Sequence, residues 1–315
     1  MYDLTIIGGG PAAAGAAVYA GRKKLKTLII TESFGGQSIV SDSIENWIGT
    51  LKITGLELAK AFENHIKIHQ DVEIKMPEKA TAVKEITGGY EVSTNKNNAY
   101  QARSIIIASG ARRRRLNVLG EDKFDGKGVS YCSTCDAPIF KDKIVAIVGG
   151  GNAGAEAVID LNKYASKIYW ISRSPSSTAD PETVEEVKKL EKVAIISNAE
   201  TKEILGVKFV SGIKYLDKND NQIKELSLEG LFVEIGSVSN SELAKELVEM
   251  NKAGEIIVDH KTGATSRPGI FAAGDVTDEI YKQNNISAGD GIAAALSAYN
   301  YLLNIKKQSP AQENL

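Results

Sequence analysis

One pattern occurs twice in this chain: a short apolar run, a glycine-rich turn and an alanine-rich stretch, with a second apolar run after it. A strand, a turn, a helix and a second strand in that order form a βαβ unit, whose two strands are parallel. Two such units predict an α/β protein with two separate nucleotide-binding sites. The four strands expected from the two copies are residues 4–7, 27–31, 145–148 and 167–171.

The glycines of each turn occupy positions with distinct geometric tasks. The first permits a tight turn, the second lets the backbone approach a pyrophosphate, and the third lets the helix pack closely on the strand. The helix start then offers unpaired N–H groups to the phosphates. Close packing without any ligand is the alternative interpretation. The three positions are Gly149, Gly151 and Gly154 in the second copy, and Gly8, Gly10 and Ala13 in the first.

The chain has only two cysteines, Cys132 and Cys135, and the motif that ends at Asp136 lies 13 residues before Gly149. A dithiol beside a dinucleotide turn indicates electron transfer between a nicotinamide and a thiol. One alternative is that the cysteines are small buried hydrophobic residues. Another is a zinc site completed by His65 and His69, although residues 61–70 have the pattern of an ordinary amphipathic helix.

Composition narrows the class of protein. The chain has 43% hydrophobic and 25% charged residues and a net charge of −2, so we expect no nucleic-acid partner. No apolar run approaches the ~18 residues of a membrane span, so we expect no membrane partner. The first expected strand lies at the amino end without a signal-peptide pattern, and we therefore expect a cytoplasmic protein. In a reducing compartment a Cys-x-x-Cys pair is more often catalytic than structural.

Two further segments extend the pattern. Residues 267–275 are expected to contain an apolar strand that ends on Gly274 and Asp275, and residues 287–302 are expected to form an apolar helix. The polar tail after Lys306 is expected to fray.

The motifs together resemble one family over nearly the whole chain. They read, in order, IIGGGPAAAGAAVYAGR, FGGQ, IENWIG, IIIASGA, YCSTCDAPIF, VAIVGGGNAGAEA, GIFAAGDVTDEIYKQ and SAGDGIAAALSAYNYL. They resemble the low-molecular-weight thioredoxin reductases and, about as closely, the flavoprotein subunit of alkyl hydroperoxide reductase without its N-terminal domains. The resemblance implies an α/β fold of two Rossmann-like domains, a nicotinamide-binding domain (114–241) inserted into an FAD-binding domain (1–113 and 242–315).

The resemblance implies FAD as cofactor. Glu32 would bind the adenosine ribose, Asn46 would pack by the isoalloxazine, and Asp275 would bind the ribitol chain. The residues at positions that bind FAD in the family are Gly8, Gly10, Pro11, Ala12, Glu32, Gly36, Gln37, Asn46, Gly110, Gly274, Asp275, Lys282, Gln283 and Ala288.

The resemblance also implies a nicotinamide cofactor. The family usually ends the second strand of this domain with a His-Arg-Arg run that binds the 2′-phosphate of NADPH; here only Arg173 matches, and no acid replaces the run. We expect NADPH, with NADH or reduced ferredoxin as alternative donors. The residues at the matching positions are Gly149, Gly151, Asn152, Ala153, Ser172 and Arg173.

Three residues receive catalytic roles from the resemblance. Cys135 would be the thiol next to the flavin, Cys132 the thiol that attacks the partner's disulfide, and Asp136 the acid/base. The implied function is a disulfide reductase acting on thioredoxin or a thioredoxin-like or glutaredoxin-like protein, as a homodimer. A flavin dithiol oxidase and a non-catalytic redox sensor remain alternatives.

Two local features complete the sequence-based expectations. The run 112–115 holds four arginines at the expected domain joint, which is either a solvated stretch or a docking patch for an acidic protein. Ala137 follows Asp136 where the family usually has glycine, and its Cβ is expected to restrict the loop.

Overall fold

The computed structural model describes residues 1–41 and 44–308, which form two compact units. Unit 1 consists of Met1–Arg112 and Val238–Leu315, and unit 2 of Arg113–Ser237. One contiguous segment is therefore inserted into a unit built from both ends of the chain. The joints expected from the sequence lie after 113 and after 241, whereas the contacts divide the chain after Arg112 and after Ser237.

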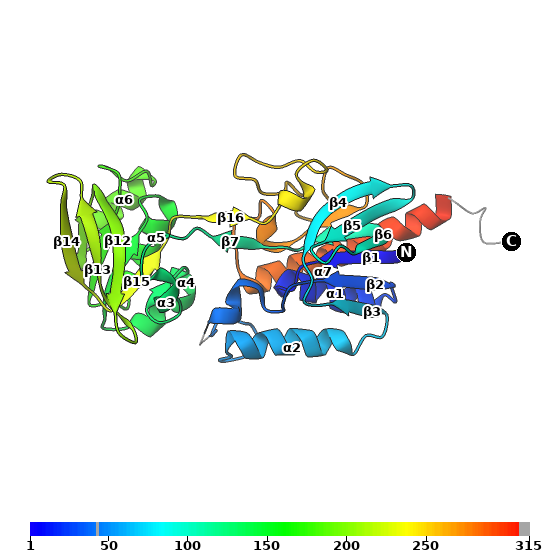
Figure 1. The fold of residues 1–315 in the computed structure, drawn as a ribbon, viewed down its shortest axis with the longest axis horizontal. Coiled ribbons are helices and arrows are strands. Elements are labelled where there is room, and N and C mark those ends of the chain that lie inside the picture. Colours follow the sequence, from blue (N-terminus) through cyan, green and yellow to red (C-terminus); the bar gives the residue numbers. More distant parts are fainter. Residues whose placement is uncertain (42–43, 309–315) are drawn as a thin grey trace. The chain divides into compact units, whose positions relative to one another are not determined.

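Unit 1 is built around a mixed sheet in the order β3-β2-β1-β6-β5-β4, with β17 also paired to β6 (Figure 1). Its strands are β1 (Tyr2–Ile7), β2 (Thr27–Ile30), β3 (Val72–Lys75), β4 (Ala80–Ile86), β5 (Gly89–Thr94), β6 (Ala99–Ile107) and β17 (Ile270–Ala272). Its helical segments are α1 (Pro11–Arg22), η1 (Gly36–Val40), α2 (Gly55–Lys67), η3 (Glu242–Ala244), η4 (Gly274–Val276) and α7 (Asn284–Gln308).

Small residues bring α1 and α7 together. Six alanines of α1 are buried, and glycines let the two helix backbones touch. A Cβ added at Gly291 would lie 1.9 Å from the carbonyl oxygen of Ala12, and one added at Gly15 would lie 2.4 Å from that of Ala288. This packing fixes the start of α1 against the start of α7.

The parallel strands of unit 1 place several candidate residues along one edge. β2, β6 and β17 run parallel to their neighbours around β1, so their carboxyl ends meet at the same edge of the sheet. Gly8 follows β1, Glu32 follows β2, Gly110 follows β6 and Gly274 follows β17. Ligands of open α/β sheets bind at this carboxyl edge.

Unit 2 contains a parallel sheet in the order β11-β10-β9-β15-β8 and an antiparallel sheet β12-β13-β14. Its strands are β8 (Val129–Ser130), β9 (Ile144–Val148), β10 (Lys167–Ile171), β11 (Val193–Ile196), β12 (Ala199–Gly206), β13 (Val210–Asp217), β14 (Gln222–Ser227) and β15 (Gly230–Val233). Its helical segments are α3 (Glu121–Phe124), α4 (Ser133–Asp136), η2 (Ala137–Phe140), α5 (Asn152–Asn162) and α6 (Pro181–Lys188).

A two-stranded ribbon connects the units. It pairs β7 (Ala111–Arg113) with β16 (Ser237–Ser239), as Figure 1 shows. Two arginines of the 112–115 run form ion pairs with carboxylates. Arg112 lies 2.7 Å from Glu242. Arg115 lies 3.1 Å from both Asp122 and Asp125. These two side chains therefore anchor the ends of the ribbon within their own units.

The expected strands at 4–7, 27–31, 145–148 and 167–171 all form, with bounds within two residues of the prediction. The last helix is longer than expected, because α7 begins at Asn284 rather than Ser287 and continues to Gln308. The expected fraying of the tail beyond residue 308 lies outside the described residues. α2 ends at Lys67, so His65 lies on it and His69 does not.

Within 1–41 and 44–308, no helix is long and apolar enough to span a membrane. In the same residues no cluster of three or more His, Cys, Asp or Glu side chains is arranged to hold a metal ion. His65 and His69 belong to unit 1, whereas the cysteines belong to unit 2.

Two glycines of α7 offer a matched test of the α1–α7 packing. Gly291→Ala should destabilise the protein by about 1–3 kcal/mol, because its Cβ collides with the backbone of Ala12. Gly289→Ala should be neutral or stabilising by up to about 1 kcal/mol, because that Cβ meets nothing within 4 Å and alanine favours a helix. Urea denaturation followed by circular dichroism measures both; equal stabilities of the two variants would contradict the packing described here.

Candidate flavin, nicotinamide and dithiol sites

The first glycines of the two turns have similar backbone conformations. Gly8 has φ +130° and Gly149 has φ +152°, backbone conformations that residues other than glycine rarely adopt. A Cβ at Gly8 would lie 2.1 Å from the carbonyl oxygen of Ala108, and one at Gly149 would lie 2.1 Å from that of Glu234. In each unit the first glycine is therefore needed where the turn crosses a neighbouring strand end.

The second glycines leave open space at the helix starts. Gly10 and Gly151 are the N-caps of α1 and α5, and neither helix receives a side-chain cap hydrogen bond. A Cβ at Gly10 would come no closer than 3.8 Å to another atom, and one at Gly151 no closer than 3.9 Å. Since helix N–H groups bind phosphate, both cradles fit a dinucleotide pyrophosphate.

The third position differs between the copies. A Cβ at Gly154 would lie 2.0 Å from the carbonyl oxygen of Gly149, so α5 requires glycine there. At the matching place in α1, Ala13 is fully buried, and the helix accommodates its methyl group.

Hydrogen bonds connect the expected flavin-binding residues of unit 1. Asp275 accepts one from the amide of Gln37 at 3.0 Å and one from the hydroxyl of Ser287 at 3.2 Å. The amide of Asn46 donates to Gln283 at 3.3 Å. The structure thus brings together residues from the 35–37 loop, the loop around Asn46, and the start of α7.

The remaining flavin candidates line the same edge. A Cβ added at Gly36 would lie 3.2 Å from the Cα of Gly10. Residues 35–37 therefore pack directly against the first glycine turn. Gly274 has φ +74°, and a Cβ there would meet the Ala12 side chain at 3.0 Å. Lys282 pairs with Glu255 at 3.2 Å, and the exposed Glu32 pairs with Lys79 at 3.5 Å.

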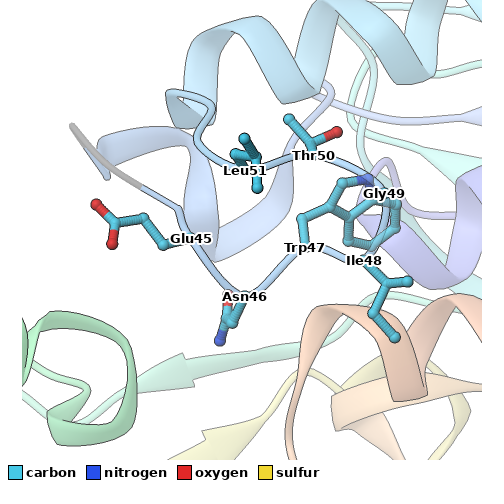
Figure 2. A pocket seen from close by; sticks show the side chains of 7 residues that line it. All are labelled: Glu45, Asn46, Trp47, Ile48, Gly49, Thr50 and Leu51. Atoms are coloured by element: carbon cyan, nitrogen blue, oxygen red, sulfur yellow. The ribbon is translucent and has the colours of Figure 1, made fainter.

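A hollow of about 500 Å³ lies within the loop that carries Asn46. Figure 2 shows Glu45 and Asn46 pointing away from the Trp47 ring, which packs edge-on against Phe62 at 5.6 Å. Ile48 and Leu51 in this loop are strongly exposed. Trp47 anchors the loop, while Asn46 is left to face Gln283.

In unit 2 a tryptophan of the second strand, to which the sequence assigns no role at the site, supports the second glycine turn. The indole N–H of Trp170, a buried residue of β10, donates to the carbonyl oxygen of Gly149 at 2.6 Å. The side chain of Asn152 accepts from the backbone N–H of Asp180 at 2.8 Å. Ser172 is buried and bonded to Ser174, whereas Arg173 and Ala153 are exposed. The expected 2′-phosphate-binding residue, Arg173, therefore lies at a solvent-facing position.

Cys132 and Cys135 form a disulfide at the start of α4. The Cys132 sulfur accepts the backbone N–H of Cys135 at 3.2 Å and so caps the helix. Cys132 is half-buried, whereas Cys135 is exposed. A short hydrogen-bond network surrounds the pair: the Ser130 hydroxyl donates to Asp136 at 2.6 Å and accepts the N–H of Cys132 at 3.2 Å.

The role of Ser130 cannot be predicted from the sequence, because a serine two residues before a cysteine is not part of a recognisable motif.

Ala137 does not strain the loop: it has helical φ and ψ (−51°, −39°), and its side chain is buried. The Cβ of Ala137 is expected to restrict the backbone, but the backbone here has a conformation that alanine adopts readily.

The dithiol and the second glycine turn follow neighbouring strands. Cys132 comes just after β8, Glu234 directly after β15, and Gly149 directly after β9. Glu234 accepts the backbone N–H of Ser133 at 3.1 Å. Burial raises the pKa of Glu234 to about 7, against the opposing attraction of Arg113. The carboxyl edge of unit 2 thus holds both a glycine turn that fits a pyrophosphate and the Cys132–Cys135 disulfide.

A family model described as "Pyridine nucleotide-disulphide oxidoreductase" matches residues 2–291. The chain is 42% identical to an NADH dehydrogenase of Bacillus subtilis and 41% identical to an alkyl hydroperoxide reductase component of Escherichia coli, over 96% and 97% of its length. It spans 59% of the length of each of these two relatives.

Solved structures of similar length resemble it along nearly the whole chain. Thioredoxin reductase from Streptococcus pyogenes matches with a TM-score of 0.90 and 33% identity, covering 96% of this chain and 99% of that one. Thioredoxin reductase from T. acidophilum matches with a TM-score of 0.65 and 36% identity, covering 95% and 98%. The fold is thus two Rossmann-like domains, unit 2 being inserted in unit 1, and the chain belongs to the pyridine nucleotide-disulphide oxidoreductase family of flavin- and nicotinamide-dependent oxidoreductases.

Proposed function

We propose that this chain is an FAD-dependent disulfide reductase that passes two electrons from NADPH or NADH, through Cys132 and Cys135, to a thioredoxin-type protein. The observation that carries the proposal is the Cys132–Cys135 disulfide on the same sheet edge as the Gly149 cradle. A flavin dithiol oxidase needs no nicotinamide cradle, and a nicotinamide-dependent reductase of ferredoxin or of a quinone needs no dithiol. This chain has both features.

When bound, FAD would take a hydride from the reduced nicotinamide and pass two electrons to the disulfide. In unit 1 the start of α1 and Gly10 would hold its pyrophosphate, Glu32 its ribose, and Asp275 its ribitol. Gln37 and Ser287 orient the Asp275 carboxylate. In unit 2 the start of α5 and Gly151 would hold the nicotinamide pyrophosphate.

The chain's own thiols carry the exchange with the partner. After reduction, the Cys132 thiolate attacks one sulfur of the partner's disulfide, which forms a mixed disulfide and releases the partner's other sulfur as a thiolate. Cys135 then attacks the Cys132 sulfur, which restores the internal disulfide and releases the partner's second thiolate. Asp136 supplies a proton to a departing thiolate, with Ser130 holding its carboxylate. Because Cys132 is half-buried, its sulfur must become more accessible for this exchange.

The electron acceptor has a second candidate. The relatives named as components of alkyl hydroperoxide reductase are 38–42% identical to this chain, compared with 33% and 36% for the thioredoxin reductases of Streptococcus pyogenes and T. acidophilum. This favours a thioredoxin-like module of a hydroperoxide-reducing system as an alternative acceptor. Assays with a free thioredoxin and with such a module compare the two acceptors directly. A homodimer and a cytoplasmic location stay predictions.

Serine substitutions separate the two halves of the reaction. Cys132→Ser and Cys135→Ser should each lower reduction of a thioredoxin disulfide by at least about a thousandfold, because a single thiol cannot release a mixed disulfide. Anaerobic bleaching of the flavin absorbance by NADPH or NADH should persist in both variants. Thr134→Ser, in the same motif, serves as the control that retains both activities. Loss of bleaching together with disulfide reduction would contradict the proposed electron path.

Arg173 tests the choice of nicotinamide. If the donor is NADPH, Arg173→Ala should raise the KM for NADPH about tenfold and leave that for NADH nearly unchanged, since a charge-assisted hydrogen bond contributes about 1.5–3 kcal/mol. Lys208→Ala, which removes an exposed cation elsewhere in unit 2, is the control. Equal KM changes for both donors would show that Arg173 does not read the 2′-phosphate. Stopped-flow flavin reduction measures each value.

A further inference from the structure

We propose that Glu234 is a positioning residue for the dithiol: its carboxyl group holds the first turn of α4 through the Ser133 N–H, and its charge controls how readily the neighbouring thiols ionise. The inference rests on the proposed disulfide exchange at Cys132. It concerns a residue that belongs to none of the motifs that bind cofactor or carry the thiols.

The geometry places Glu234 between the two halves of the unit 2 site. Its backbone N–H donates to Val148 at 2.8 Å, and its carbonyl oxygen is the atom that excludes a Cβ at Gly149. Its side chain reaches the opposite way, to the N–H of Ser133 at 3.1 Å. Ser133 is the residue next to Cys132, so the carboxyl group contacts the backbone of the redox loop itself. One residue therefore contacts both the glycine turn and the dithiol segment.

Ser133 has two separate hydrogen-bond partners. Its hydroxyl donates to Asp160 of α5 at 3.2 Å, whereas its backbone N–H donates to Glu234. The charged groups that act on Glu234 are Arg113, which favours its ionised form, and Asp160 and Glu156, which oppose it. With burial added, the carboxyl group titrates near neutral pH.

The two protonation states of Glu234 affect the loop differently. The ionised carboxylate accepts a stronger, charge-assisted hydrogen bond from Ser133 and fixes α4. Its negative charge also disfavours a second negative charge on a nearby thiolate. Protonation of Glu234 near pH 7 weakens its hydrogen bond to Ser133 and removes its repulsion of a thiolate. As pH rises through this range, more thiol ionises, but the new negative charge on Glu234 partly opposes that ionisation.

Alkylation of the reduced protein by iodoacetamide tests the electrostatic effect. The rate at Cys132 and Cys135 is followed by peptide mass spectrometry from pH 5.5 to 8.5, because only the thiolate reacts. The wild-type rate should rise with a lag around pH 7. Glu234→Gln should lack the lag: its rate should match wild type at pH 5.5 and exceed it about three- to tenfold at pH 8, as for a coupling of up to about one pKa unit.

Glu156→Gln is the matched control, since it removes a neighbouring negative charge from an exposed α5 residue that has no hydrogen bond to the redox loop among the described contacts. It should keep the lag. If the Glu234→Gln profile superimposes on that of wild type, or if Glu156→Gln loses the lag equally, the electrostatic role is wrong. Thermal unfolding by circular dichroism checks that each variant folds.

Hydrogen exchange tests the positioning effect separately. Glu234→Leu removes the acceptor, so exchange in the peptide that carries Ser133 should become at least about tenfold faster. Glu234→Gln keeps a carbonyl oxygen in place and should change exchange much less. Unchanged exchange in Glu234→Leu would overturn the positioning role. Neither experiment uses a nicotinamide or a protein partner, so its failure is distinguishable from failure of the proposed reductase activity.

Discussion

The parallel pairing of β8, β15 and β9 is the constraint on which the unit 2 site depends. Because the three strands run the same way, whatever follows each of them emerges at one edge. A dithiol, a carboxyl group and a glycine turn, more than a hundred residues apart at the extremes, therefore become neighbours. No contact between their side chains is needed to bring them together; the backbone hydrogen bonds of the sheet do so.

Much of this arrangement is readable from the sequence. The repeated turn predicts two βαβ units because glycine is needed where backbone crosses backbone, and Gly8 and Gly149 both meet a carbonyl oxygen at 2.1 Å. The pairing of Cys132 with Cys135 follows from their spacing and from their being the only cysteines. Such features are predictable because each depends on a few positions that only one residue type can occupy.

The residues that sequence reasoning misses act through long-range contacts. Glu234 directly follows a strand of ordinary apolar residues, and nothing local shows that its carboxyl group reaches Ser133, 101 positions away. Trp170 reads as a core residue, which it is, but its N–H also holds Gly149. The start of α7 is misplaced by three residues because Asn284 and Asn285 resemble a loop, whereas their side chains bond the segment around Ser38 and Asn46. Tertiary partners decide such cases.

The ribbon of β7 and β16 has a consequence for how such a protein could arise. The two ends of unit 2 leave unit 1 as paired neighbours, with Arg114 bonded to Gly236 at 3.0 Å just beyond them. From the standpoint of unit 1, the whole insert occupies the place of a hairpin loop. Replacing a short loop by a folded segment with adjacent ends adds little closure entropy and leaves the host sheet unbroken. A gene fragment encoding such a segment could be gained, lost or exchanged as a single cassette.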